Sequence, residues 1–143
     1  MSINTQRHFP LPLKGEFLGE ERWRLTEPFI YLYRNHRVTV PKDFITDGGS
    51  IPWLAQLIIG GHWSGKYPKA CVPHDYGYHS QKLKRKIVDK DFLIGMKILG
   101  VPFWKRQTMY RVVRACSWVC WIKHKRKLKK AQNSPIPLSE KNT

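Results

Sequence analysis

The sequence is poor in two kinds of residue, cysteine and acid. It has 3 cysteines in 143 residues, an odd and sparse count that gives no disulfide framework, so we expect reduced thiols. Only 10 residues are Asp or Glu, against 26 Lys or Arg, and the formal net charge is +16. This excess of positive charge says little about the fold, but it favours an anionic partner: nucleic acid, anionic lipid or an acidic protein.

Two kinds of hydrophobic segment are also missing. The N-terminal stretch "MSINTQRHFPLPLKG" lacks the apolar region of a secretory signal peptide. No apolar run approaches the roughly 20 residues that a helical membrane span needs. Hydrophobic residues nevertheless make up 41% of the chain, which is unlike a disordered composition. We therefore expect one domain with a real core, either soluble or peripheral to a membrane.

The order of sequence patterns predicts an α+β fold. Residues 1–21 show no clear period and are predicted to form an N-terminal arm, followed by a single α+β domain over 22–130 and a disordered tail over 131–143. The segments "FIYLY" and "RVTV" are rich in β-branched and aromatic residues, and "RNH" between them is typical of a turn. They predict a β-hairpin near 28–40, within a stretch of short strands.

Three helices are predicted after the hairpin. The segment 69–80 has helical character, and 86–99 has an apolar side and a stop signal in Gly100. A third helix is predicted to start near 102 and to continue into "KHKRKLKK". Its apolar residues repeat at intervals of three and four, which is typical of an amphipathic helix. Two of them are cysteines, which we expect in the core. The apolar stripe consists of Met109, Val112, Val113, Cys116, Val119 and Cys120.

The first two predicted helices carry a candidate catalytic pair. On a helix, His74 and Tyr78 are four residues apart and share a face. If the next helix packs antiparallel, Asp89 can face His74. A carboxylate bonded to one imidazole nitrogen fixes the tautomer and leaves the other nitrogen as a base. Tyr78 could also donate a hydrogen bond to Asp89. Arg114 is expected to pair with a buried acid, and Asp89 is a candidate for that role too.

A candidate metal site lies beside this pair. Asp75 is expected to point slightly aside, and "TDGGS" offers Asp47 and glycine carbonyls. Calcium takes six to eight oxygen ligands, including carboxylates and backbone carbonyls. The structural alternatives are that His74 and Asp75 bond backbone groups at a helix start and that Asp47 is a turn residue before glycine.

Three of these segments resemble parts of a known enzyme family. "ACVPHDYGY" followed by "VDKDFLIGM" resembles the active-site helices of secreted phospholipase A2, above all its bacterial and fungal branch, and "TDGGS" resembles its loop. The resemblance implies a three-helix, phospholipase A2-like core in which His74 is the general base, oriented by Asp89 with support from Tyr78. It also implies that calcium stabilises the oxyanion formed at an ester carbonyl. The implied calcium ligands are Asp75, Asp47 and the carbonyl of Gly48.

The chain departs from that family at one cysteine. The bacterial loop usually has a cysteine bonded to the one before the histidine. Here Gly49 holds that position, which leaves Cys71 alone. The N-terminal hairpin is also foreign to the small bacterial phospholipase fold.

The chain also resembles a small uncharacterised family of phage and prophage proteins. Four motifs carry this likeness over about residues 20 to 115: TDxxSxP, HDxxY, DxxF and YxxVR. This likeness implies a phage or prophage origin. Together with the phospholipase resemblance, it implies a calcium-dependent lipid ester hydrolase that acts at anionic membrane surfaces. The alternative is a non-enzymatic phage structural or accessory protein that contacts other phage proteins. Both interpretations place it in the host cytoplasm, in the virion or at the membrane periphery.

The basic end of the last helix is a candidate binding surface. It follows Trp118, Trp121 and Ile122, so it could lie on anionic lipid or contact phosphate backbones of nucleic acid. The alternative is a solvated helix end, and His124 is expected to be solvated. The candidate surface residues are Lys123, Lys125, Arg126, Lys127, Lys129 and Lys130.

Overall fold

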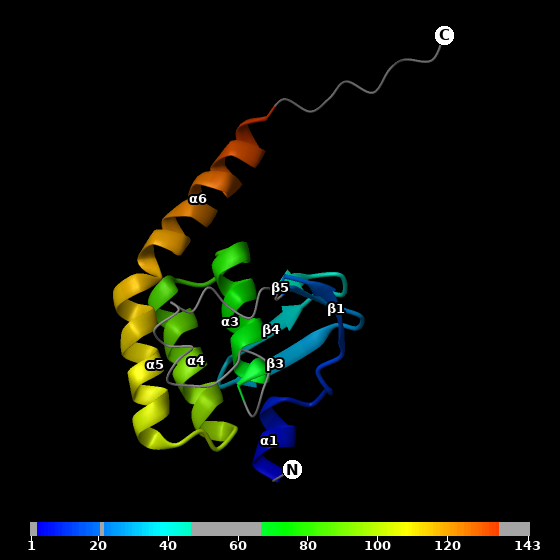
Figure 1. Cartoon of the computed structure of the whole chain (residues 1–143), viewed down its shortest axis with the longest axis vertical. Helices are drawn as coiled ribbons and strands as arrows, with labels where there is room; N and C mark the ends of the chain where they lie inside the picture. The colour runs from blue at the N-terminus through cyan, green and yellow to red at the C-terminus, as the bar shows by residue number, and fades with distance from the viewer. Residues whose placement is uncertain (1–2, 21, 47–66, 135–143) are drawn as a thin grey trace.

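The protein is described here by a computed structural model that covers residues 3–20, 22–46 and 67–134. After the short helix α1, small antiparallel sheets come before the other helices along the chain (Figure 1). Helices α3, α4 and α5 lie side by side, with α3 next to the strands. The mixed α+β arrangement is thus confirmed. The strands are β1 (Gly15–Gly19), β2 (Arg22–Leu25), β3 (Phe29–Tyr33), β4 (His36–Val40) and β5 (Ile45–Thr46). The helices are α1 (Ile3–His8), α3 (Pro68–Ser80), α4 (Arg85–Ile98), α5 (Phe103–Cys116) and α6 (Trp118–Asn133).

The predicted hairpin is confirmed as β3 and β4. The two strands pair antiparallel, with Phe29 opposite Val40 and Tyr31 opposite Val38. Phe29, Tyr31 and Val40 are buried, because alternate side chains of a strand point to the same face and this face packs toward Val72 of α3. The two-residue turn places Arg34 in a left-handed conformation, with φ of 47°.

The segment predicted as an arm contains two elements that the sequence pattern missed. Helix α1 is followed by Phe9, whose ring packs 4.9 Å from that of Tyr31. Strand β1 pairs with β2, and β2 pairs with β5, to form a three-stranded sheet. Four of the five residues of β1 are exposed, so the strand lacks the alternation by which a half-buried strand is recognised.

Helices α3 and α4 form a close antiparallel pair. A Cβ added at Gly77 of α3 would lie 2.6 Å from Cγ1 of Val88, and one at Gly95 of α4 would lie 3.3 Å from the Cβ of Ala70. Glycine therefore lets the backbones approach at both ends of the pair. The predicted bounds of both helices are confirmed to within a residue, and α3 continues through Pro73.

Helix α4 ends at the predicted glycine. Gly100 has φ of 77°, and its N–H donates to the carbonyl of Lys97 while the N–H of Val101 donates to that of Met96. This pair of bonds is a Schellman motif, which satisfies the last carbonyls of a helix. Val101 is buried after the turn, so the chain reverses into α5.

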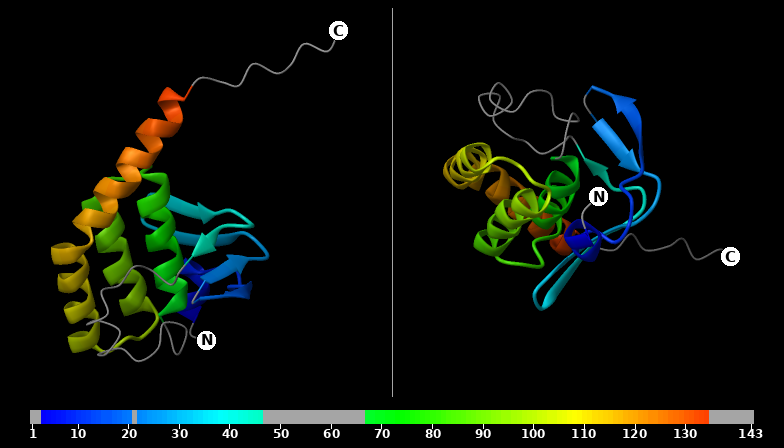
Figure 2. Two further views of the ribbon diagram at one scale, coloured as in Figure 1. Left: turned by 45° about the horizontal axis from the view of Figure 1, so that its top comes forward. Right: turned by 90° about the horizontal axis from the view of Figure 1, so that it is seen from below.

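The third predicted helix is instead two helices. It is interrupted at Ser117, and α6 then extends away from the other helices (Figures 1 and 2). Met109 and Val113 of α5 are buried, but no residue of α6 is. The prediction that Cys116 and Cys120 lie in the core is wrong, since Cys116 is exposed and Cys120 half-buried.

The far end of α6 enters the segment predicted as a tail. The helix continues to Asn133, and residues 135–143 lie outside the described part of the chain. Within the described ranges, no helix combines the length and the apolar character needed to cross a membrane.

The contact between Gly77 and Val88 predicts an unusual effect of alanine. In an open helix, Gly→Ala stabilises by about 1 kcal/mol. We expect Gly77→Ala to destabilise by about 1–3 kcal/mol instead, because the added methyl overpacks the helix interface. Urea unfolding of Gly77→Ala and of Gly77→Ala with Val88→Ala checks this. The second substitution should cost less in the Gly77→Ala background than in the wild type, and equal costs would contradict the packing.

Candidate functional site

Asp89 is the centre of the candidate site. Its side chain is fully buried between α3, α4 and α5. Oδ1 accepts hydrogen bonds from Nε2 of His74 at 2.9 Å and from Oη of Tyr78 at 2.6 Å. Oδ2 accepts from Nη1 of Arg114 at 2.7 Å. The predicted contacts of Asp89 with His74, with Tyr78 and with Arg114 are therefore all confirmed, and they occur together.

The surroundings of Asp89 keep it ionised. Burial by itself would raise the pKa of this carboxyl group, but the hydrogen bonds from His74, Tyr78 and Arg114 outweigh it and hold the pKa below its ordinary value of 3.8. Burial and the bond to Asp89 raise the pKa of Tyr78, so the phenol remains a donor. The bond to Asp89 also raises the pKa of Arg114.

His74 is held by packing as well as by its hydrogen bond. Its ring centroid lies 4.6 Å from that of Tyr78 and 4.7 Å from that of Phe92, and 10% of the side chain is exposed. Since an ionised carboxylate only accepts hydrogen bonds, the proton lies on Nε2, and Nδ1 of the neutral ring is left with a lone pair. His74 is therefore packed between helices and is not a loosely held surface side chain.

A second arginine that the sequence interpretation missed also approaches Asp89. Nε of Arg85 lies 4.0 Å from Oδ2 of Asp89, and Nη2 of Arg85 donates to the backbone carbonyl of Arg114 at 3.3 Å. The signal was present in the sequence, because Arg85 and Asp89 are four residues apart on one helix. Two guanidinium groups thus offset one buried carboxylate.

The proposed calcium ligands lie only partly within the described residues. Asp75 is buried, and its Oδ1 lies 3.7 Å from Nε2 of His79. Burial, followed by the charge of Asp75, raises the pKa of Cys71 to about 12. Asp47 and Gly48 lie outside the described residues. Residues 3–20, 22–46 and 67–134 contain no group of three His, Cys, Asp or Glu suited to a metal, so the calcium site remains a prediction.

A second histidine–aspartate pair lies on the other side of α4, and the sequence interpretation did not foresee it. Nε2 of His36 in β4 is 2.6 Å from Oδ2 of Asp91, and Oη of Tyr31 donates to the backbone carbonyl of Asp91 at 3.3 Å. Desolvation raises the pKa of Asp91, although His36 opposes the shift. No sequence signal joins residues 55 positions apart.

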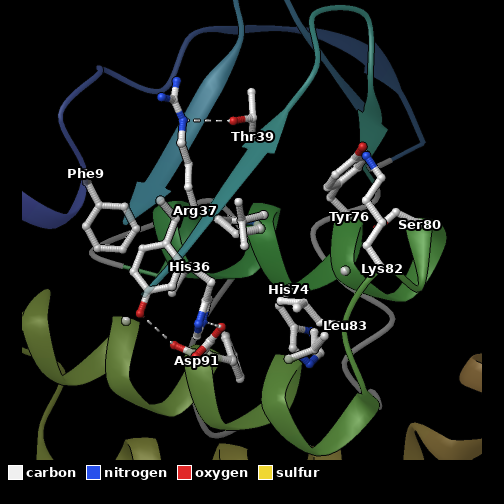
Figure 3. Close-up of a pocket in the computed structure, with 18 residues that line it drawn as sticks. Phe9, His36, Arg37, Thr39, His74, Tyr76, Ser80, Lys82, Leu83 and Asp91 are labelled. Carbon is white, nitrogen blue, oxygen red and sulfur yellow. Dashed lines mark hydrogen bonds and ion pairs between the residues drawn. The ribbon is translucent and has the colours of Figure 1, made fainter. Parts of the chain in front are cut away.

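The His36–Asp91 pair and His74 line the same cavity. This cavity lies between the β3–β4 hairpin and the α3–α4 pair and has a volume of about 270 Å³. Figure 3 shows His36 and Asp91 toward one side of it and His74 nearer the middle. His74 therefore connects a fully buried carboxylate with a space that can hold a small ligand.

The six predicted basic residues lie on α6. Lys123, Lys125 and Arg126 are exposed, as are the three lysines that follow them. His124 is half-buried, with its ring centroid 4.0 Å from that of His79, so the expectation that it is solvated is wrong. The basic surface is thus displayed on a helix that has few contacts with the body.

The architecture and the buried histidine–aspartate pair define a small α+β protein with a polar site between helices. Residues 23–113 match the family described as "Protein of unknown function (DUF1353)", and the chain belongs to that family. It is 36% identical over 98 residues to "Uncharacterized protein y4jT" of Sinorhizobium fredii (strain NBRC 101917 / NGR234). That match covers 68% of this chain and 29% of the relative, so the chain spans less than a third of the relative's length. No solved structure matches it.

The opposite pKa shifts of the two aspartates predict opposite effects of acid. Since the pKa of Asp89 is lower in the folded state, its contribution to stability is complete above pH 3.8 and is lost as the pH falls below that value. Since the pKa of Asp91 is raised, its ionisation disfavours folding as the pH rises through 3.8. Asp89→Asn should therefore lose less stability than the wild type between pH 5 and about pH 3, and Asp91→Asn should lose more.

Urea unfolding at several pH values in this range measures both effects. The two variants control for each other, since each removes one carboxylate from α4. Equal acid sensitivity of the two variants would contradict the assignment of the shifts.

Proposed function

We propose that this protein is a calcium-dependent hydrolase of lipid esters that acts at anionic membrane surfaces, with a phospholipase A2-like site and a phage or prophage origin. One observation supports the hydrolase most directly. Nε2 of His74 is bonded to a buried, ionised Asp89 that Tyr78 also holds. This is the arrangement that a histidine general base requires.

In the proposed reaction, Nδ1 of His74 takes a proton from a water molecule while the water oxygen attacks the ester carbonyl carbon. The tetrahedral intermediate then collapses, the bond to the alcohol oxygen breaks, and His74 returns the proton to that oxygen. Asp89 keeps the ring oriented and stabilises the imidazolium that forms in between. Calcium held by Asp75, Asp47 and the carbonyl of Gly48 would stabilise the negative charge on the carbonyl oxygen.

The exposed residues of α6 are consistent with an enzyme that acts at a lipid surface. At its start Trp118 is 52% exposed and Val119 is 41% exposed, and the six basic residues follow. Aromatic and aliphatic side chains beside clustered lysines are typical of helices that lie in the interface of anionic membranes. Nucleic acid is the alternative partner, since the same cations can contact phosphates.

Two observations favour a second candidate, a non-enzymatic phage structural or accessory protein. Arg114 and Arg85 both approach Asp89, and 10% of the His74 side chain is exposed. A carboxylate already offset by guanidinium groups stabilises an imidazolium less. In this alternative the network serves only to hold α3, α4 and α5 together.

Substitutions at adjacent residues separate catalysis from metal binding. We expect His74→Gln to retain calcium binding by calorimetry but to lose hydrolysis of phospholipid vesicles by at least about a hundredfold, the scale of general base catalysis. Asp75→Asn should lose both. His8→Gln is the matched control and should retain both, because His8 bonds the carbonyl of Leu32 away from the site.

Two results would reject the enzyme. Undiminished hydrolysis by His74→Gln would show that His74 is not the general base. The absence of saturable calcium binding by the wild type at millimolar calcium would show that the protein has no calcium site. The structural alternative gains if His74→Gln lowers the free energy of unfolding and the wild type hydrolyses no ester.

Removing positive charge from α6 tests whether this helix binds anionic membranes. The triple variant Lys123→Gln, Lys127→Gln and Lys130→Gln should bind vesicles of phosphatidylserine and phosphatidylcholine about a hundredfold more weakly, since each cation near such a surface is worth about 1 kcal/mol. A control variant removes the same charge from exposed lysines elsewhere: Lys42, Lys90 and Lys97. Equal weakening by both variants would show that net charge alone acts. Loss of DNA binding without any vesicle binding would favour nucleic acid.

A further inference from the structure

The cavity between the hairpin and the helix pair extends along α3. Its lining follows α3 from Ala70 to Ser80, ten residues that extend about 15 Å along a helix. The volume of the cavity is about 270 Å³. Figure 3 shows Phe9 near one end, Ser80 and Lys82 near the other, and His74 between them.

Most of the cavity wall is apolar. The apolar lining includes Phe9, Val38, Ala70, Leu83, Val88 and Phe92. The inward polar pair, His36 and Asp91, is bonded to itself at 2.6 Å, so each polar group already has a partner. An apolar ligand can therefore lie along this wall without leaving these two groups unpaired, which is the main cost of burying polar atoms.

Cations lie where the cavity meets solvent. Lys82 and Arg37 are exposed and belong to the lining, and Nε of Arg37 donates to Oγ1 of Thr39 at 3.3 Å. Lys82 lies at the end opposite Phe9 (Figure 3). The cavity thus extends from the buried Phe9 at one end to a basic end at Lys82.

We propose that this cavity binds one unbranched fatty acyl chain, with the chain toward Phe9 and the carboxylate beside Lys82. The apolar lining along α3 fits a flexible hydrocarbon chain, and the basic end matches a carboxylate. The binding stands on the cavity alone. It does not depend on the ester hydrolysis proposed above.

Binding of free fatty acids tests the inference without any ester. Calorimetry with saturated fatty acids of increasing length, kept below their micelle concentrations, should give one molecule per protein. The affinity should rise about fourfold for each added methylene group and stop rising once the chain fills the cavity. Equal affinity for all lengths, or no saturable binding at any length, would overturn the proposal.

Matched substitutions locate the chain. Leu83→Trp narrows the cavity near Lys82 and should weaken binding of the best fatty acid by at least about tenfold. Ile87→Trp adds the same side chain at an exposed position outside the lining and should have no effect. Circular dichroism and urea unfolding establish that both variants are folded. Equal affinity of the two variants would place the chain elsewhere.

A charge reversal locates the carboxylate. Lys82→Glu should weaken fatty acid binding about two- to fivefold, the scale of an exposed ion pair. Lys84→Glu makes the same change two residues away, outside the lining, and should leave binding unchanged. An equal loss in both variants would show attraction by net charge only, which would overturn the proposed orientation.

The fatty acid measurements and the ester assay have separate outcomes. If the protein binds fatty acids but hydrolyses no ester, the proposal for the cavity is supported and the proposed hydrolase activity is rejected. If the protein hydrolyses esters but binds no fatty acid of any length, the proposal for the cavity is rejected and the proposed hydrolase activity is supported.

Discussion

The structure depends on the burial of one negative charge. An isolated carboxylate inside a protein costs many kcal/mol unless other groups compensate it. Asp89 on α4 is compensated by donors from α3 and α5, namely His74, Tyr78 and Arg114. Each donor comes from a helix that must lie in one register for the bonds to form. The bonds to Asp89 therefore fix the relative positions of α3, α4 and α5. The close approach of Gly77 and Val88 lets α3 and α4 come near enough for these bonds to form.

Helix α4 carries a second aspartate, Asp91, which points to the opposite side of the helix from Asp89. Asp91 follows Asp89 by two residues, so the two side chains point about 200° apart around the helix. One carboxylate faces the helices and meets cations, while the other faces the hairpin and meets His36. The same helix thus organises a compact polar network on one side and a hollow, largely apolar space on the other. His74 belongs to both, through its bond to Asp89 and its place in the cavity lining.

Local patterns predicted much of the fold and the contacts of Asp89. Helical spacing placed Tyr78 beside His74, and an antiparallel pair of helices placed both against Asp89; each step needs only short-range geometry. The His36–Asp91 pair could not be predicted, because the packing of β4 on α4 has no periodic signal. Strand β1 was missed because it is exposed on both faces. The apolar repeat after Met109 suggested one long helix, but it does not reveal that only the part before Ser117 is covered by other helices.

The weak attachment of α6 makes its order dependent on its surroundings. Trp121 packs edge-on against Tyr78, and its carbonyl accepts a bond from Gln81, but beyond His124 the helix has exposed residues only. Cations four apart, such as Lys123 and Lys127, repel each other along one face, and a short helix without tertiary contacts is marginal in water. An anionic surface would remove this repulsion. Binding and helix formation would then be one coupled equilibrium, in which the partner supplies the stability that the protein body does not.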